Sequence, residues 1–266
     1  PGPIGKTVED CATLLNLIAG RDIYDATTSP QPVPDFTKQI QKGVKGIRIG
    51  ICYTDHEKLK GSDAAKAVSE AGKIFERLGA NIELVPVSEN LQKGHIFDPN
   101  YAVAAYTVVQ RSEVSSNLAG YNGIRYDYGR AFFGDEAKRR IMLGTFTLSK
   151  GYSDRYYITA QKVRSLYINN YRELFGTYDL LIAPTSPGYA QKLGATKDNP
   201  MYGELEDILL EPSTISGLPG ISVPCYRDPK TNLYIGLNIM ANYWQEEKII
   251  SAAYAFEQAT QWNSWK

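Results

Sequence analysis

The sequence has no excess of charge of either sign, and this absence limits the partners it can bind. Of its 266 residues, 29 are Lys or Arg and 29 are Asp or Glu. A balanced surface gives no long-range attraction for phosphate backbones, so tight, direct binding of nucleic acid is not expected. Long apolar runs are missing too, and none approaches the roughly 20 residues that span a bilayer. We therefore expect no membrane partner and no nucleic acid bound by the chain alone.

Cysteine is scarce and unpaired. The three cysteines, Cys11, Cys52 and Cys225, are far apart, and none belongs to a C-x-x-C pair. This pattern favours reduced, partly buried thiols over a disulfide framework or a metal site. It predicts a location in the cytoplasm or in an organellar matrix. The sequence also begins at Pro1 rather than at Met, which predicts that it is part of a longer protein.

The usual catalytic patterns are absent as well. The sequence has no Gly-Gly pair and no G-x-G, so it lacks a phosphate loop and a dinucleotide-binding fingerprint. No Ser is followed three residues later by Lys. The two histidines, His56 and His95, fall in predicted loops, where we expect solvated side chains rather than a general base. We expect no catalytic residue, metal ion or cofactor in this chain.

Hydrophobic periodicity predicts an α/β protein. Residues 46–51 and 80–87 are apolar runs typical of strands, and between them Ser62 caps a helix that ends at Gly79. This strand–helix–strand order predicts a parallel pair of strands joined by a right-handed crossover. The order also favours a sheet that is covered by helices on both faces.

Other local signals extend this prediction. Thr7 and Asp10 are spaced as a capping box at the start of a first helix. The proline-rich residues 21–45 are expected to form a long surface connection. Two apolar runs joined by a polar turn predict a hairpin over 221–240. Further helices are predicted over 98–120, 134–149, 152–175, 204–216 and 246–259, and a further strand over 179–183.

A few polar side chains within helical or apolar segments are candidates for binding a ligand. Arg139 and Arg140 are neighbours on a predicted helix, where adjacent positions diverge by about 100°, so they are not expected to face water equally. An inward arginine needs an anion, either a structural acid or a substrate carboxylate, and spacing alone favours the acid. Asp207 is expected at a solvated position in the first turn of a helix, or at a pocket edge. Tyr106 is expected in the core with its hydroxyl at the rim.

Several motifs resemble a known family. Residues 2–10, G-P-I-G-K-T-V-E-D, resemble the segment that follows the catalytic region of amidase-signature enzymes. Residues 138–145, K-R-R-I-M-L-G-T, are similar to the A subunits of glutamyl-tRNA(Gln) amidotransferases in particular. Further similar segments are S-S-N-L at 115–118, G-I-R-Y at 123–126, G-Y at 151–152, A-Q-K-V-R at 160–164, A-P-T-S-P at 183–187 and G-L-P-G-I-S-V-P at 217–224.

The resemblance implies a fold, a reaction and partners. It implies that residues 1–266 are the C-terminal part of a single amidase domain, with a mixed central sheet between layers of helices. It implies glutamine hydrolysis by a Ser–cis-Ser–Lys triad that lies upstream of this chain, with the ammonia passed to a partner subunit. The implied partners are the amidotransferase B and C subunits and, through the complex, tRNA(Gln). ATP and Mg are implied for a partner subunit, and none for this chain.

The resemblance also implies a glutamine pocket. Arg140 corresponds to the arginine that pairs with the substrate α-carboxylate, Asp207 to the acid that faces its amino group, and Tyr106 to a tyrosine that lines the pocket. None of the triad residues has a counterpart here, so the chain alone is expected to be inactive. Two alternatives remain open: an amidase that acts on other amides, and a non-catalytic scaffold that only binds partner subunits.

Overall fold

The chain is organised around a central sheet in a computed structural model that describes residues 2–95, 97–121, 123–195 and 206–264. The strands in these ranges are β1 (Arg48–Cys52), β2 (Asn81–Val85), β3 (Leu180–Pro184), β4 (Gly220–Arg227) and β5 (Tyr234–Met240). Their order is β2-β1-β3-β5-β4. β1 pairs in parallel with β2 and β3, whereas β5 is antiparallel to both β3 and β4. The expected mixed sheet, its parallel pair and its hairpin are confirmed.

The helices begin where local signals place them. The main helices described are α1 (Val8–Ile18), α2 (Asp63–Arg77), α3 (Val87–Gln92), α4 (Pro99–Leu118), α5 (Asp135–Leu148), α6 (Thr159–Thr177), α8 (Glu211–Ser216) and α9 (Glu246–Thr260). Thr7 and Asp10 form the predicted capping box, with reciprocal bonds of 3.0 and 3.1 Å. Ser62 Oγ accepts the Ala65 amide at 3.1 Å and so caps α2. These caps satisfy amide groups that a helix start otherwise leaves unpaired.

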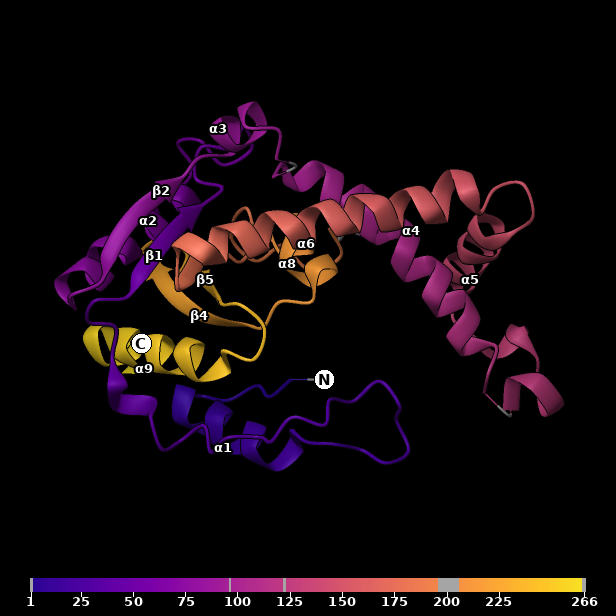
Figure 1. Ribbon diagram of the computed structural model, residues 1–266, viewed down its shortest axis with the longest axis horizontal. Helices are drawn as coiled ribbons and strands as arrows, with labels where there is room; N and C mark the ends of the chain where they lie inside the picture. Colours follow the sequence, from indigo (N-terminus) through magenta and orange to yellow (C-terminus); the bar gives the residue numbers. More distant parts are fainter. Residues whose placement is uncertain (1, 96, 122, 196–205, 265–266) are drawn as a thin grey trace.

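One face of the sheet is covered by α2 and α9. α9 lies between the sheet and α1 (Figure 1). Buried aliphatic side chains of β1, β3 and β5 meet these helices, for example Ile49, Ile182 and Ile239, each fully buried. α1 is attached through Glu257 of α9, whose Oε2 accepts the Val8 amide at 2.9 Å. The N-terminal helix is thus held by a side chain near the other end of the chain.

The connection over 21–45 is less exposed than expected. Phe36, Ile40 and Val44 are buried in the same core, and residues Ile40–Lys42 form one turn of 3₁₀ helix, η1. The expectation of a purely surface connection is wrong for its second half. The three apolar side chains are spaced by four residues, which brings them to one face of a turn-rich segment.

The other face of the sheet is covered by α6, α8 and the first half of α4. Tyr53, Tyr167 and Tyr171 are buried there beside Leu181. The hydroxyls of Tyr53 and Tyr171 are 2.7 Å apart, so each supplies the other with a polar partner inside the core. The expectation that helices cover both faces is therefore confirmed.

Two predicted helices begin later than expected. The segment predicted as a helix over 152–175 starts as a π-helical turn, η4 (Asp154–Ile158), and continues as α6. The helix predicted over 204–216 is observed only as α8, because residues 207–210 form turns; residues 204–205 lie outside the described residues. Pro212 stands in the first turn of α8, where its fixed φ and missing N–H favour a helix start.

Beyond the sheet, two helices form an arm, which we define as α5 together with residues 109–118 of α4. Figure 1 shows the arm extending away from the sheet and from α9. α5 packs mainly on α4, in the most extensive helix–helix contact of the described residues. None of the described helices combines the length and the apolar character that crossing a membrane requires.

Candidate functional site

Arg140 lies on α5 in the arm. Its Nε donates to Glu136 Oε1 at 2.7 Å, one helical turn back. Arg139 donates to the same carboxylate through Nε and Nη2, both at 2.7 Å. The two arginine side chains are similarly exposed, 29% for Arg139 and 36% for Arg140. The expectation that they would differ in exposure is therefore wrong, because two long side chains reach one acid at i−3 and i−4.

The charges of this cluster favour a bound anion. The hydrogen bond from Arg139 is the largest cause that lowers the pKa of Glu136 to about 2; partial desolvation opposes it, and the Arg140 hydrogen bond adds to it. Glu136 is therefore ionised at neutral pH. Two guanidiniums and one carboxylate leave one net positive charge. The structural acid that spacing favoured is present, and it leaves charge over for a further anion.

Gly144 fixes where α5 lies on α4. A Cβ at this position would overlap the Arg111 carbonyl oxygen and lie 2.6 Å from its carbon. Only glycine permits this approach without a shift of backbone. Two hydroxyl pairs lie beside it, Ser115 Oγ with Thr145 Oγ1 at 2.9 Å and Ser112 Oγ with Thr147 Oγ1 at 2.7 Å. The contact between the two helices is thus made by small and hydroxyl side chains.

The same contact determines the position of Arg140. The hydroxyl pairs advance in opposite directions along the two helices, so α4 and α5 are antiparallel. Arg140 precedes Gly144 by one turn and therefore lies beside the end of α4 at Leu118. Tyr106 lies earlier on α4, roughly 18 Å away along an axis that rises about 1.5 Å per residue.

Tyr106 and Asp207 lie near the sheet instead. Tyr106 is partly buried and packs against the core cluster that contains Ile208 and Leu209. Asp207 immediately precedes these two residues, and its carbonyl oxygen accepts the Leu210 amide at 2.8 Å. Its carboxylate is solvent-exposed, yet desolvation by the surrounding protein raises its pKa. The structure brings Tyr106 and Asp207 to one region and holds Arg140 apart from them, so a shared pocket remains a prediction.

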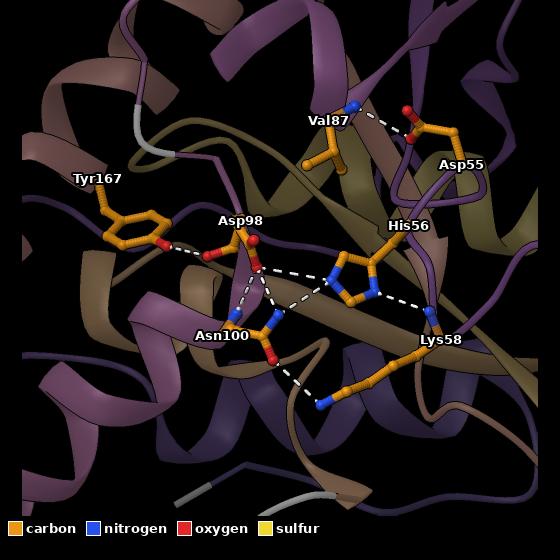
Figure 2. A network of polar contacts seen from close by, with 7 residues as sticks. All are labelled: Asp55, His56, Lys58, Val87, Asp98, Asn100 and Tyr167. Atoms are coloured by element: carbon orange, nitrogen blue, oxygen red, sulfur yellow. Dashed lines mark hydrogen bonds and ion pairs between the residues drawn. The ribbon is translucent and has the colours of Figure 1, made fainter.

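Figure 2 shows a polar network around His56, in the loop that follows β1. His56 Nε2 lies 3.5 Å from Asp98 Oδ1 and 3.3 Å from Asn100 Nδ2, and its Nδ1 accepts the Lys58 amide at 3.4 Å. The ring is 4% exposed, so the expectation of a solvated histidine is wrong. Its partners lie about 40 residues further on, at the start of α4, which is why sequence spacing did not reveal them.

The network joins three elements. Asp98 Oδ1 accepts the Asn100 amide at 2.8 Å and caps α4, while the Tyr167 hydroxyl of α6 donates to the Asp98 carbonyl oxygen (Figure 2). Asp55, beside His56, accepts the Val87 amide at 3.0 Å. These contacts hold the start of α4 against the loop after β1. We interpret the network as a structural support for α4 rather than as a catalytic group.

Other nucleophile or metal candidates have ordinary surroundings. His95 Nε2 pairs with Glu173 Oε2 at 2.8 Å. Cys52 is fully buried, and burial raises the pKa of the Cys52 and Cys225 thiols, the latter to about 12. The three cysteines are free, as expected. The described residues contain no group of three or more His, Cys, Asp or Glu side chains suited to a metal ion.

Comparison with known proteins identifies the family. The sequence profile of the family described as Amidase matches residues 1–250. The chain belongs to the Amidase family. This membership confirms the resemblance suggested by the motifs and agrees with the mixed sheet between layers of helices.

Individual relatives of this amidase carry more specific names. It is 38% identical over 279 residues to the A subunit of the glutamyl-tRNA(Gln) amidotransferase from Rippkaea orientalis, with 100% of this chain and 56% of the relative covered. It is 40% identical over 280 residues to the protein of the same name from Clostridium botulinum (strain Langeland), with the same coverage. The chain spans about half the length of these relatives.

A solved structure agrees with the computed fold. The glutamyl-tRNA(Gln) amidotransferase A subunit of Thermotoga maritima, known from a crystal structure, is 36% identical, with a TM-score of 0.73. The match covers 97% of this chain and 52% of the Thermotoga chain. The α/β architecture is therefore that of an amidase-signature protein.

Sequence reasoning missed the parts of the site that support the candidate residues. Glu136 stands at i−3 and i−4 from the two arginines, a spacing that predicts an ion pair on any helix. Ser112 and Ser115 are spaced by three residues and fall on the face that Gly144 approaches. Both signals were present in the sequence, but only knowledge of which helices touch gives them a meaning.

Proposed function

We propose that this amidase is the glutamine-binding part of an amidotransferase subunit that releases ammonia from the glutamine side chain. The observation that carries this proposal is the match to glutamyl-tRNA(Gln) amidotransferase A subunits, which extends over the whole chain at 38 to 40% identity. The charge cluster on α5 supports it, because a fixed arginine with net positive charge suits an α-carboxylate better than a neutral amide.

In this proposal each candidate residue has one role. Arg140 pairs with the substrate α-carboxylate, Asp207 attracts its α-ammonium group, and Tyr106 forms a wall of the pocket. The Ser–cis-Ser–Lys triad belongs to the part of the relatives that this chain does not cover. The two parts must meet so that the Arg140 region closes over the pocket near Tyr106 and Asp207.

The proposed partners follow from the names of the relatives. The ammonia is transferred to a B subunit, which uses ATP and Mg to amidate glutamate on misacylated tRNA(Gln), and a C subunit completes a heterotrimer. tRNA(Gln) contacts this chain only through the complex. The proposed location is the cytoplasm or an organellar matrix.

A glutaminase assay on the full-length protein tests the proposal. We expect ammonia release from glutamine by the full-length protein and none from residues 1–266 alone, since no residue here acts as a nucleophile with a matched base. An amide without α-carboxylate and α-amino groups serves as the comparison substrate. If that amide is cleaved as well as glutamine, the chain belongs to an amidase of other amides. If the full-length protein cleaves neither, the scaffold alternative gains support.

A further inference from the structure

Glu136 holds its two arginines in different ways. It accepts two hydrogen bonds from Arg139, from Nε and Nη2, but only one from Arg140, from Nε. A guanidinium carries one N–H on Nε and two on each terminal nitrogen. The side of Arg139 formed by Nε and Nη2 is thus occupied. Only Nε of Arg140 takes part in a described hydrogen bond.

This difference leaves the terminal edge of Arg140 available. Nη1 and Nη2 can donate two parallel hydrogen bonds to a carboxylate, the geometry that gives such pairs their strength and direction. The Arg140 side chain is 36% exposed, so a ligand can reach that edge. The bond from Nε to Glu136 restricts rotation at the far end of a side chain that otherwise has many rotamers.

Glu136 also adjusts the charge that a ligand meets. Without it, two neighbouring guanidiniums would compete for one carboxylate. With it, one net positive charge remains, which matches a single substrate carboxylate. Lys138 does not change this balance, because it lies 3.8 Å from Asp135 on the same turn.

We propose that Glu136 is a positioning residue that selects Arg140, rather than Arg139, as the arginine that binds the substrate α-carboxylate. This inference rests on the proposed function and deepens it. Glu136 does not touch the substrate. It occupies Arg139 from the side and turns the terminal edge of Arg140 toward the ligand.

Asp135 supplies a matched control. It has the same charge, lies on the same helical turn and is fully exposed, and its described partner is Lys138 rather than an arginine. Asp135→Asn therefore removes one negative charge from this turn without disturbing either guanidinium. Glu136→Gln removes the corresponding charge from the residue that contacts both.

Steady-state kinetics of the full-length protein with glutamine test the proposal. In Glu136→Gln we expect KM to rise about 5- to 30-fold while kcat changes by less than about twofold, since ground-state binding is lost. Asp135→Asn should leave both constants within about twofold of wild type. Glu136→Asp keeps the charge but shortens the reach, so its KM should lie between those of wild type and Glu136→Gln. Thermal unfolding temperatures of all variants should be similar.

Two further measurements separate positioning from a structural role. The double variant Glu136→Gln/Arg140→Ala should be no worse than Arg140→Ala, because Glu136 acts only through that side chain. An amide without an α-carboxylate should show no change of KM in Glu136→Gln. A rise for both substrates, or an unchanged KM for glutamine, overturns the positioning role while the proposed function stands. If the wild-type protein releases no ammonia from glutamine, the proposed function fails and the positioning role fails with it.

Discussion

The sheet with its covering helices and the arm are held together by different physics. In the sheet region, large apolar side chains such as Phe75 and Phe256, with ring centroids 5.2 Å apart, fill a buried core. In the arm, the contact between α4 and α5 depends on Gly144 and on hydroxyl pairs. The outer face of α5 leaves Met142 72% and Phe146 46% exposed. The sheet region is stabilised mainly by burial of apolar surface, and the arm by close approach of two backbones.

The difference predicts how each region responds to substitution. Removing atoms from the sheet core leaves a cavity and lowers the stability of the whole fold. Adding atoms to the arm contact forces two backbones apart and should act locally. Because Arg140 lies in the arm, the candidate site depends on the less deeply packed region. That is the region in which local opening costs less free energy.

The largest effect should come from Gly144→Ala. The added Cβ overlaps the Arg111 carbonyl oxygen, so α5 must move, at an expected cost of about 3 kcal/mol or more. Hydrogen exchange should show lost protection in α5 and unchanged protection in β3 and β5. Gly176→Ala in α6 is the control, because a Cβ there meets nothing within 4 Å. Equal loss of protection in the arm and the sheet would show that the two regions are not independent.

Arg140→Ala should affect catalysis more than folding. In the full-length protein we expect kcat/KM for glutamine to fall by about 2–4 kcal/mol, or about 30- to 1000-fold, and Arg139→Ala to cost much less. Asp207→Ala should act in the same direction with a similar or smaller loss. Steady-state kinetics provide the measurement. If Arg139 proves the more sensitive of the two, the assignment of the carboxylate-binding arginine is wrong.

In the sheet region, Tyr53→Phe should lower the free energy of unfolding by about 1–2 kcal/mol, since it leaves the Tyr171 hydroxyl without its partner in the core. The double variant Tyr53→Phe/Tyr171→Phe should cost less than the sum of the single variants. Denaturant unfolding monitored by circular dichroism checks both values. Strict additivity would mean that the two hydroxyls do not depend on each other.

The smallest effect concerns the ion cluster of the arm. The pKa of Glu136 is lowered from 4.5 to about 2 in the folded state, so the unfolded state binds its proton more tightly. The contribution of this carboxylate to stability is therefore present above pH 4.5 and is lost as the pH falls toward 2. Since the cluster is exposed and screened by solvent, we expect less than about 1 kcal/mol.

Denaturant unfolding at pH 6 and at pH 3 checks this sign (both values approximate the two sides of the window). Relative to wild type, Glu136→Gln should be less stable at the higher pH and nearly equal at the lower one. High salt should reduce the difference. A larger difference at low pH would contradict the assigned direction of the pKa shift.

Local signals in the sequence determined much of the fold. The capping box at Thr7, the β1–α2–β2 unit and the β4–β5 hairpin are specified within short windows, where periodicity, caps and turn residues agree. The three candidate pocket residues came instead from motifs shared with relatives. Spacing alone favoured structural or solvated roles for Tyr106, Arg140 and Asp207, and their common pocket remains to be tested.

Only the tertiary structure decided which side chains are buried and what they contact. His56 is buried because α4 returns over the loop after β1, and Phe36 is buried because α9 lies across the turn-rich connection. Gly144 matters because α4 passes directly beside it, and Glu136 because two neighbouring arginines reach the same acid. A sequence records the spacing of residues along one element, whereas these contacts depend on how separate elements pack. Packing geometry is a property of the whole chain, so no short window of sequence contains it.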